Sequence, residues 1–237
     1  MTNHDFITLP VADGTSLDAY VALPEGAGPF PGIILLQEAF GVNGHIRSIA
    51  ERLCQEGYAI IAPDLFHRTV HRLEASYADF SAIMPHYQAI TQEGLTADLR
   101  AVHGWLQEQA QVLPEKIGSI GFCLGGRVAF LANAVLPLAA GVSYYGGGLH
   151  TLTQEAAHLH GPHLFFWGGK DVHIPQEKID LIINAVQAAG KEYVNTVISY
   201  ADHGFHCDER ESYHPQAAQE AWAMTLAFLA NRLRPKP

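Results

Sequence analysis

The chain has 237 residues, which is long for one small module and short for two full domains at roughly 150 residues each. Apolar residues make up 48% of it, which supplies a large core and excludes a disordered chain. Charged residues make up 16%, against roughly 25% in average soluble proteins. The formal charge of −10, without a basic run, disfavours nucleic acid and an anionic membrane surface as partners. We therefore expect one domain over residues 1–237.

Cysteine usage and the longest apolar runs indicate where the chain is found. Cys54, Cys123 and Cys207 are widely spaced, cannot all pair with one another and form no CxxC motif, which is typical of a reducing compartment. The first ten residues lack a basic region followed by an apolar stretch, and every apolar run is far below the ~20 residues of a membrane span. We expect a cytoplasmic protein.

The predicted elements alternate between strand and helix. The run 32–36 is continuously apolar, which predicts a strand buried on both faces. The segment 44–55 has Ile46, Ile49, Ala50 and Leu53 at helical spacing, and Gly57 closes it. In chain order we predict strands at 6–9, 17–23 and 32–36 (with a turn at 24–31 between the last two), a helix at 44–55, a strand at 59–62, a helix at 93–109, a strand at 116–120, a helix at 125–134, strands at 139–144 and 163–167, a helix at 175–189, a strand at 193–199 and a helix at 215–232.

This alternation predicts an α/β fold: a doubly wound, mostly parallel sheet with helices on both faces. Ligands in such sheets bind at the carboxyl ends of the strands. Reactive side chains that follow strand ends are therefore the candidates for a functional site.

The first candidate is a cysteine between two glycines. The segment 121–126, GFCLGG, follows the strand at 116–120 and precedes a helix, which is the setting of a nucleophile elbow with Cys123 in place of serine. Glycine at 121 and 125 removes side chains that would collide in so tight a turn. The N-terminus of the following helix favours a thiolate and offers N–H donors to an oxyanion. The alternative is a small buried cysteine without chemistry.

A thiol nucleophile needs a base and a group that orients the base. In this class of fold the chain order is nucleophile, acid, histidine. Asp171 follows the strand at 163–167, and His203 follows the strand at 193–199, so both lie at the sheet edge expected for Cys123. Taken singly, Asp171 could cap the helix near Pro175 and His203 could be a surface residue.

Two histidine spacings raise the question of a metal. They are His67-x3-His71 and His203-x2-His206-Cys207. Neither has a second pair at the spacing of a structural zinc site, so we expect no metal and no cofactor.

Taken together, the motifs resemble the dienelactone hydrolase family of α/β-hydrolases over nearly the full chain, from about Phe6 to Leu233. The resemblance rests on the segments 36–41 (LQEAFG), 62–66 (APDLF), 121–126 (GFCLGG), 144–146 (YYG), 168–171 (GGKD) and 203–205 (HGF). It implies the α/β-hydrolase fold and a Cys123–His203–Asp171 triad that opens an ester or lactone through an acyl-enzyme.

The resemblance also implies roles around the triad. Glu38 would hold the resting thiol and take its proton when substrate arrives. By position, Glu38 follows the buried strand at 32–36, where a carboxylate needs a partner. The alternative is an ordinary glutamate in a surface loop. The backbone N–H groups of Leu124 and Ala39 would form the oxyanion hole. Phe40 and Tyr145 match positions that line the substrate pocket, although core packing explains aromatic residues there equally well.

One departure concerns the substrate. Family members that act on dienelactone have two arginines that bind its carboxylate, one of them four residues beyond the triad histidine. That position is Cys207 here, with Arg210 three residues further on, and the region of the other arginine offers only Arg68 and Arg72. A thiol cannot replace a bidentate guanidinium.

We therefore predict a hydrolase of small carboxylic esters or lactones, acting on a small molecule as a monomer or small homo-oligomer. A general carboxylesterase or thioesterase without lactone preference remains an alternative. So does a non-catalytic protein of the same fold that senses redox state through a Cys123–Cys207 disulfide.

Overall fold

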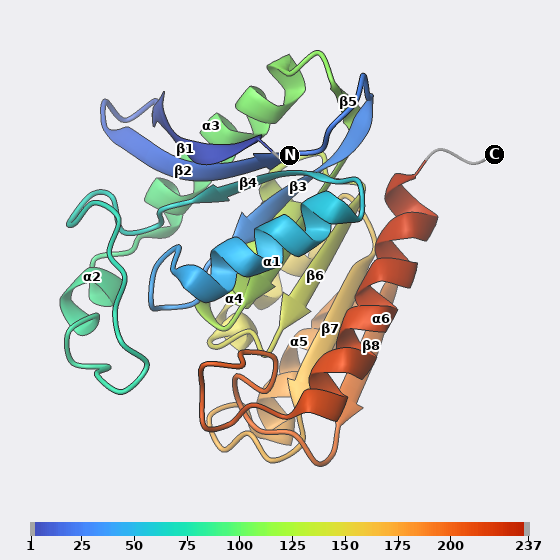
Figure 1. Ribbon diagram of the computed structural model, residues 1–237. Coiled ribbons are helices and arrows are strands. Elements are labelled where there is room, and N and C mark those ends of the chain that lie inside the picture. The colour runs from blue at the N-terminus through green and yellow to red at the C-terminus, as the bar shows by residue number, and fades with distance from the viewer. Residues whose placement is uncertain (1–2, 235–237) are drawn as a thin grey trace.

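The computed structural model describes residues 3–234, which form one eight-stranded sheet with helices on both faces (Figure 1). The strand order is β1-β2-β4-β3-β5-β6-β7-β8. β1 and β2 are antiparallel to their neighbours and all other pairs are parallel. The strands are β1 Asn3–Pro10, β2 Ser16–Leu23, β3 Phe30–Leu36, β4 Ala59–Pro63, β5 Val112–Phe122, β6 Ala140–Tyr144, β7 His163–Gly168 and β8 Tyr193–Ile198. The predicted doubly wound, mostly parallel sheet is confirmed.

Helices α1 and α6 lie in front of the sheet in Figure 1, and α3, α4 and α5 lie behind it. The helices are α1 Gly44–Gln55, α2 Met84–Gln88, α3 Gln92–Glu108, α4 Leu124–Val135, α5 Gln176–Ala188 and α6 Pro215–Leu233, with a 3-10 helix at Leu149–His158. All five predicted helices are present. The sequence reasoning missed α2 and the 3-10 helix, since neither has an apolar repeat long enough to be recognised.

The core consists of two apolar clusters, and β3 contributes to both. Ile33 and Leu35 belong to the cluster that includes residues of α1 and α6, whereas Ile34 and Leu36 belong to the cluster that includes residues of α3 and α4. All four side chains are fully buried, each worth about 1.5–3 kcal/mol of stability. The continuous apolar run of this strand is thus explained by burial on both of its faces.

The register of the parallel strands determines where the loops meet. Leu36 pairs with Gly121, Phe122 with Tyr144, Tyr144 with Phe166, and Gly168 with Ile198. Because these partners are the last residues or nearly the last residues of their strands, the chain leaves β3, β5, β7 and β8 at one edge of the sheet. This edge is at the lower end of Figure 1.

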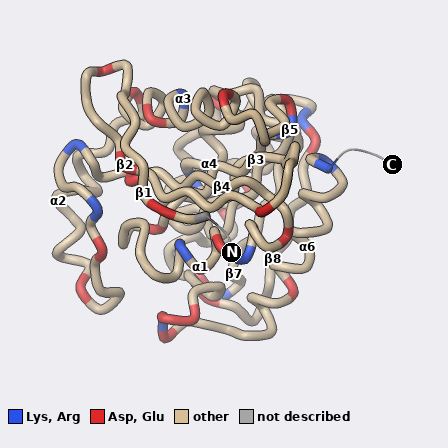
Figure 2. Tube along the Cα trace, turned by 45° about the horizontal axis from the view of Figure 1, so that its top comes forward, with Lys and Arg blue, Asp and Glu red and all other residues tan. Residues whose placement is uncertain are grey.

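The surface carries the acidic balance of the sequence. In Figure 2 the Lys and Arg residues are dispersed among Asp and Glu rather than gathered along one face. Between residues 3 and 234, no helix has both the length and the apolar character that crossing a bilayer requires.

Candidate active site

Cys123 occupies a sharp turn between the end of β5 and the start of α4. Its φ of 53° is in the left-handed region, which a non-glycine residue adopts only at a cost of about 1–3 kcal/mol. A Cβ on Gly121 would lie 1.9 Å from the carbonyl oxygen of Gly125, and a Cβ on Gly125 would lie 2.1 Å from the carbonyl oxygen of Leu36. Glycine is therefore required on both sides of the cysteine, and the turn presents the thiol at the N-terminus of α4.

The three candidates for nucleophile, base and orienting acid lie in one continuous chain of contacts. Cys123 Sγ is 3.1 Å from His203 Nε2, and His203 Nδ1 is 2.7 Å from Asp171 Oδ2. The other oxygen of Asp171 accepts the backbone N–H groups of His173 and Ile174, at 2.8 and 3.2 Å. Asp171 therefore orders its own loop as well as the histidine ring. The side chains of His203 and Asp171 are 11% and 1% exposed, so water scarcely weakens their contact.

The charges of Cys123 and Asp171 favour a protonated His203. Burial lowers the pKa of His203, but the Cys123 sulfur and the Asp171 carboxylate outweigh burial and raise that pKa to about 10. Burial raises the pKa of Asp171, and the bond to His203 more than offsets it, so the net pKa shift is downward. The arrangement can therefore hold an imidazolium between a carboxylate and a sulfur, which is the charge distribution that activates a thiol nucleophile.

Two backbone N–H groups in the loops that leave β3 and β5 have no partners among residues 3–234. Leu124 is the first residue of α4, and Ala39 lies in the loop after β3, the strand beside β5. Within the described residues 3–234, neither N–H has a hydrogen-bond acceptor. The loop around Ala39 is fixed because Gln37 Oε1 accepts the N–H of Leu65 at 3.0 Å. These two donors are available to an oxyanion.

Glu38 is paired with an arginine and not with the thiol. Its side chain is fully buried, with Oε1 at 3.3 Å from Arg210 Nη1 and Oε2 without a partner in the described chain. The Arg210 guanidinium lies 5.8 Å from the centre of the Phe40 ring and 5.7 Å from that of Tyr77. It also packs against Gly204, where a Cβ would lie 2.6 Å from its central carbon. Arg210, which in the sequence lies three residues beyond the family's arginine position at Cys207, thus contacts Glu38.

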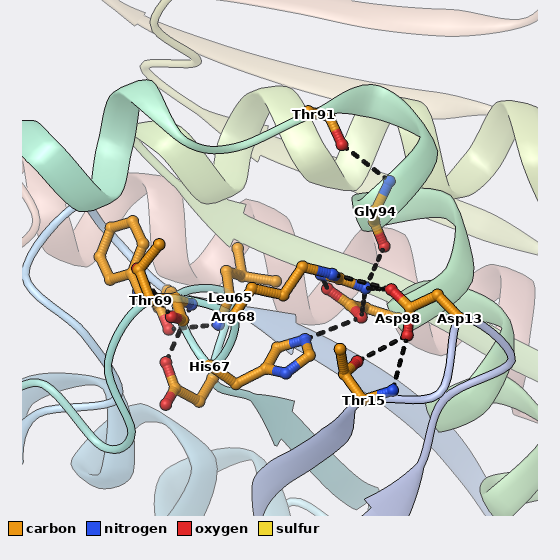
Figure 3. Close-up of polar contacts among 12 residues, drawn as sticks. Asp13, Thr15, Leu65, His67, Arg68, Thr69, Thr91, Gly94 and Asp98 are labelled. Carbon is orange, nitrogen blue, oxygen red and sulfur yellow. Dashed lines mark hydrogen bonds and ion pairs between the residues drawn. The ribbon is translucent and has the colours of Figure 1, made fainter.

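Arg68 and Arg72, the other candidates for a substrate-binding arginine, are engaged elsewhere. Arg68 donates to Asp98 at 2.8 Å and to Asp13 at 2.6 Å (Figure 3). Asp98 is fully buried, and its carboxylate also lies 3.0 Å from His67 Nε2. This network joins the loop after β4 to α3 and to the β1–β2 turn. Arg72 binds the Asp18 carboxylate at 3.0 Å.

The two aromatic candidates lie beside these charged groups. Phe40 is 3% exposed and its ring centre is 4.5 Å from that of Tyr77. Tyr145 is fully buried, its ring centre is 5.1 Å from that of His203, and its hydroxyl has no partner among residues 3–234. Burial raises the pKa of Tyr145 well above its usual value. Both positions fit a pocket wall and a packed core equally well.

The histidine spacings considered for a metal do not converge. His67 is held by Asp98, whereas His71 is exposed and lies 3.8 Å from Asp18. His203 belongs to the chain of contacts with Cys123, and the His206 ring packs on Trp222 at 5.7 Å. Sequence reasoning named Arg210 but missed Tyr77 and Asn43 as neighbours of the site, since no local motif marks them.

A mostly parallel eight-stranded sheet with a strained strand-to-helix turn at its carboxyl edge, and with a histidine and an acid in reach of it, defines the class of α/β-hydrolases. The model of the dienelactone hydrolase family matches residues 17–233, and the chain belongs to this family.

Relatives with known names cover almost the whole chain. A Synechocystis protein with the provisional name carboxymethylenebutenolidase is 34% identical over 241 residues, covering 96% of each chain. A Yersinia pestis protein of the same provisional name is 36% identical, covering 92% of this chain and 85% of its own. The crystal structure of a provisionally named dienelactone hydrolase from Klebsiella pneumoniae superposes with a TM-score of 0.88 at 33% identity, covering 97% of this chain and 99% of that one. The chain is a hydrolase that acts on ester or lactone bonds.

Proposed function

We propose that the chain hydrolyses small carboxylic esters or lactones through a covalent acyl-enzyme on Cys123. The observation that supports this most directly is the unbroken contact from Cys123 Sγ through the His203 ring to the Asp171 carboxylate, at 3.1 and 2.7 Å. Such a chain supplies a nucleophile, its base and the acceptor that orients the base.

The proposed mechanism has two halves. The Cys123 thiolate attacks the substrate carbonyl carbon, and the N–H groups of Leu124 and Ala39 stabilise the resulting oxyanion. His203 Nε2 then gives its proton to the departing alkoxide oxygen, which leaves a thioester on Cys123. In the second half, neutral His203 takes a proton from water, the hydroxide attacks the thioester, and the acid and the free thiol are released. Asp171 keeps the ring oriented throughout.

Glu38 is a second acceptor for the proton of the resting thiol. Its Oε2 is buried and has no partner within the described part of the chain, so it can take a hydrogen bond without breaking one. In this structure the sulfur contacts His203, and the exchange requires the Cys123 side chain to turn toward Glu38. Arg210 Nη1 contacts the other oxygen, Oε1, at 3.3 Å, so this pairing leaves Oε2 unoccupied.

The choice between a lactone and a simple ester depends on the anion-binding groups. Position 207 is a buried cysteine, Arg68 and Arg72 bind carboxylates elsewhere, and Arg210 is already partly neutralised by Glu38. These contacts favour, as a second candidate, an esterase or thioesterase without preference for an anionic lactone. Comparing kcat/KM for cis-dienelactone, a neutral aryl ester and an acyl thioester decides between the two.

The proposal is tested by replacing the nucleophile. Cys123→Ala should reduce turnover by at least about 10³-fold with the fold intact. Cys54→Ala is the matched control, because Cys54 is a buried thiol on α1 and should leave turnover unchanged. Wild-type rates in Cys123→Ala would refute the mechanism.

A further inference from the structure

Three side chains with metal-ligating atoms meet beside the loop that carries His203. One ligand atom each from His45, Cys207 and Asp208 lie within 4.8 Å of one another. His45 is the second residue of α1, whereas Cys207 and Asp208 lie in the loop between β8 and α6. The proposed hydrolytic mechanism uses none of the three.

The imidazole of His45 is buried without a hydrogen bond. Its side chain is 4% exposed, Nδ1 lies 3.4 Å from Asp208 Oδ1, and Nε2 has no partner anywhere in residues 3–234. Folded proteins rarely leave a buried ring nitrogen in this state. No donor among the described residues occupies either ring nitrogen, so the imidazole can offer one of them to a cation shared with Cys207 and Asp208.

Cys207 is a buried thiol with two donors directed at its sulfur. Burial and the nearby Glu38 raise the pKa of this thiol to about 12, and the Tyr77 hydroxyl and the backbone N–H of Glu209 offset part of that rise by donating to the sulfur. Tyr77 is in turn held by Asn43, whose Nδ2 donates to its hydroxyl at 2.9 Å. Asn43 also caps α1 by accepting the N–H of Ile46. Outer donors of this kind orient and stabilise metal-bound ligands.

Two of the three side chains in the cluster line a cavity, whereas Cys207 is fully buried behind them. His45 and Asp208 line a cavity of about 200 Å³ together with His206, Arg52 and Trp222. The Arg52 guanidinium lies over the Trp222 ring, 4.1 Å from its centre, so its charge is directed at the ring. The Asp208 side chain is 70% exposed. A hydrated ion can therefore enter from this cavity, and a water molecule can remain on the open side.

We propose that His45, Cys207 and Asp208 form a binding site for a zinc-class divalent cation. The donor set of one nitrogen, one sulfur and one oxygen is typical of zinc, with water in the fourth position. Metal–ligand bonds of about 2.0–2.3 Å require ligand atoms closer together than 4.8 Å, and the exposed Asp208 carboxylate can make this movement. On binding, the Cys207 thiol releases its proton to solvent and no electrons are transferred. The bound ion ties the loop that carries His203 and Arg210 to the N-terminus of α1.

The test uses Co²⁺ in place of zinc, because cobalt bound to a thiolate gives a sulfur-to-metal charge-transfer absorption. Cys123→Ser protein removes the candidate nucleophilic thiol as a competing ligand. Titration of this protein should give the band at one equivalent of Co²⁺, and Zn²⁺ should displace it. Adding Cys207→Ser should abolish the band, and adding Cys54→Ser should preserve it.

Asp208→Asn in the same background keeps the proposal falsifiable if loss of Cys207 perturbs the fold. Because this side chain is largely exposed, the substitution should leave the circular dichroism spectrum unchanged while weakening Co²⁺ binding by at least about 10-fold. Absence of the band in the Cys123→Ser protein, its survival in the added Cys207→Ser variant, or unchanged affinity in Asp208→Asn would each overturn the site. Each readout is independent of hydrolysis, so failure here leaves the proposed function untouched.

Discussion

Replacing Arg210 with glutamine should destabilise the fold, because it leaves the Glu38 carboxylate buried without its partner. The two charged groups are 3.3 Å apart, which corresponds to an attraction of about 5 kcal/mol at an effective dielectric constant of ~20. Removing one member of a buried pair costs about 3–5 kcal/mol. The Arg210 side chain is 20% exposed, so water partly screens the pair, and we expect a loss near the lower end, about 3 kcal/mol.

Urea denaturation measures this loss directly. Arg232→Gln is the matched control, since Arg232 contacts Glu192 at a similar 3.5 Å on the surface and should cost less than about 1 kcal/mol. The double variant Arg210→Gln with Glu38→Gln should recover at least half of the loss, because no unpaired charge remains. If Arg210→Gln alone unfolds at the wild-type urea concentration, the argument that Arg210 compensates a buried charge is wrong.

Three further predictions concern the residues around Cys123. Gly121→Ala should sharply lower the melting temperature, because the added Cβ would lie 1.9 Å from a backbone oxygen of α4. Gly104→Ala is the control: its added Cβ would meet no neighbouring atom within 4 Å, so this substitution should stabilise α3 by about 0.5–1 kcal/mol. Tyr145→Phe removes a buried hydroxyl without a partner in the described residues, so its melting temperature should equal or exceed that of the wild type, and a large drop would contradict this. Burial lowers the pKa of His203, but its charged neighbours raise that pKa from 6.5 to about 10. The stability contributed by the charged imidazole is therefore complete below pH 6.5 and is lost as the pH rises toward 10. Urea midpoints should fall more steeply over this pH range in the wild type than in His203→Asn.

The order of strands and helices is readable from the sequence because local signals agree with the final packing. The apolar run of β3 reflects burial on both faces, and the stripe of α1 reflects a single buried side. The edge at which Cys123, Asp171 and His203 meet follows from the rule that parallel strands end together. Their contact distances required coordinates, since loop conformation determines them.

Other features depend on contacts that no local pattern records. Arg210 reaches Glu38 only because Gly204 leaves room for its guanidinium, and a sequence gives no hint of that path. His45 and Cys207 come together from a helix start and a distant loop, so the spacing His203-x2-His206-Cys207 contained the cysteine but not the histidine beside it. The short α2 lies in the long segment after β4; its five residues are too few for a stable helix alone, and His86 and Tyr87 contact Thr69 and Arg127 outside it.

The covalent acyl group on Cys123 is the most direct test of the account. The protein is mixed with a hindered aryl ester whose acyl group leaves slowly, quenched in acid, and analysed by peptide mass mapping alongside the phenol released. We predict one equivalent of phenol and one acyl group, located on Cys123. One equivalent of phenol with Cys123 unmodified, or with the acyl group on Cys54 or Cys207, would contradict it.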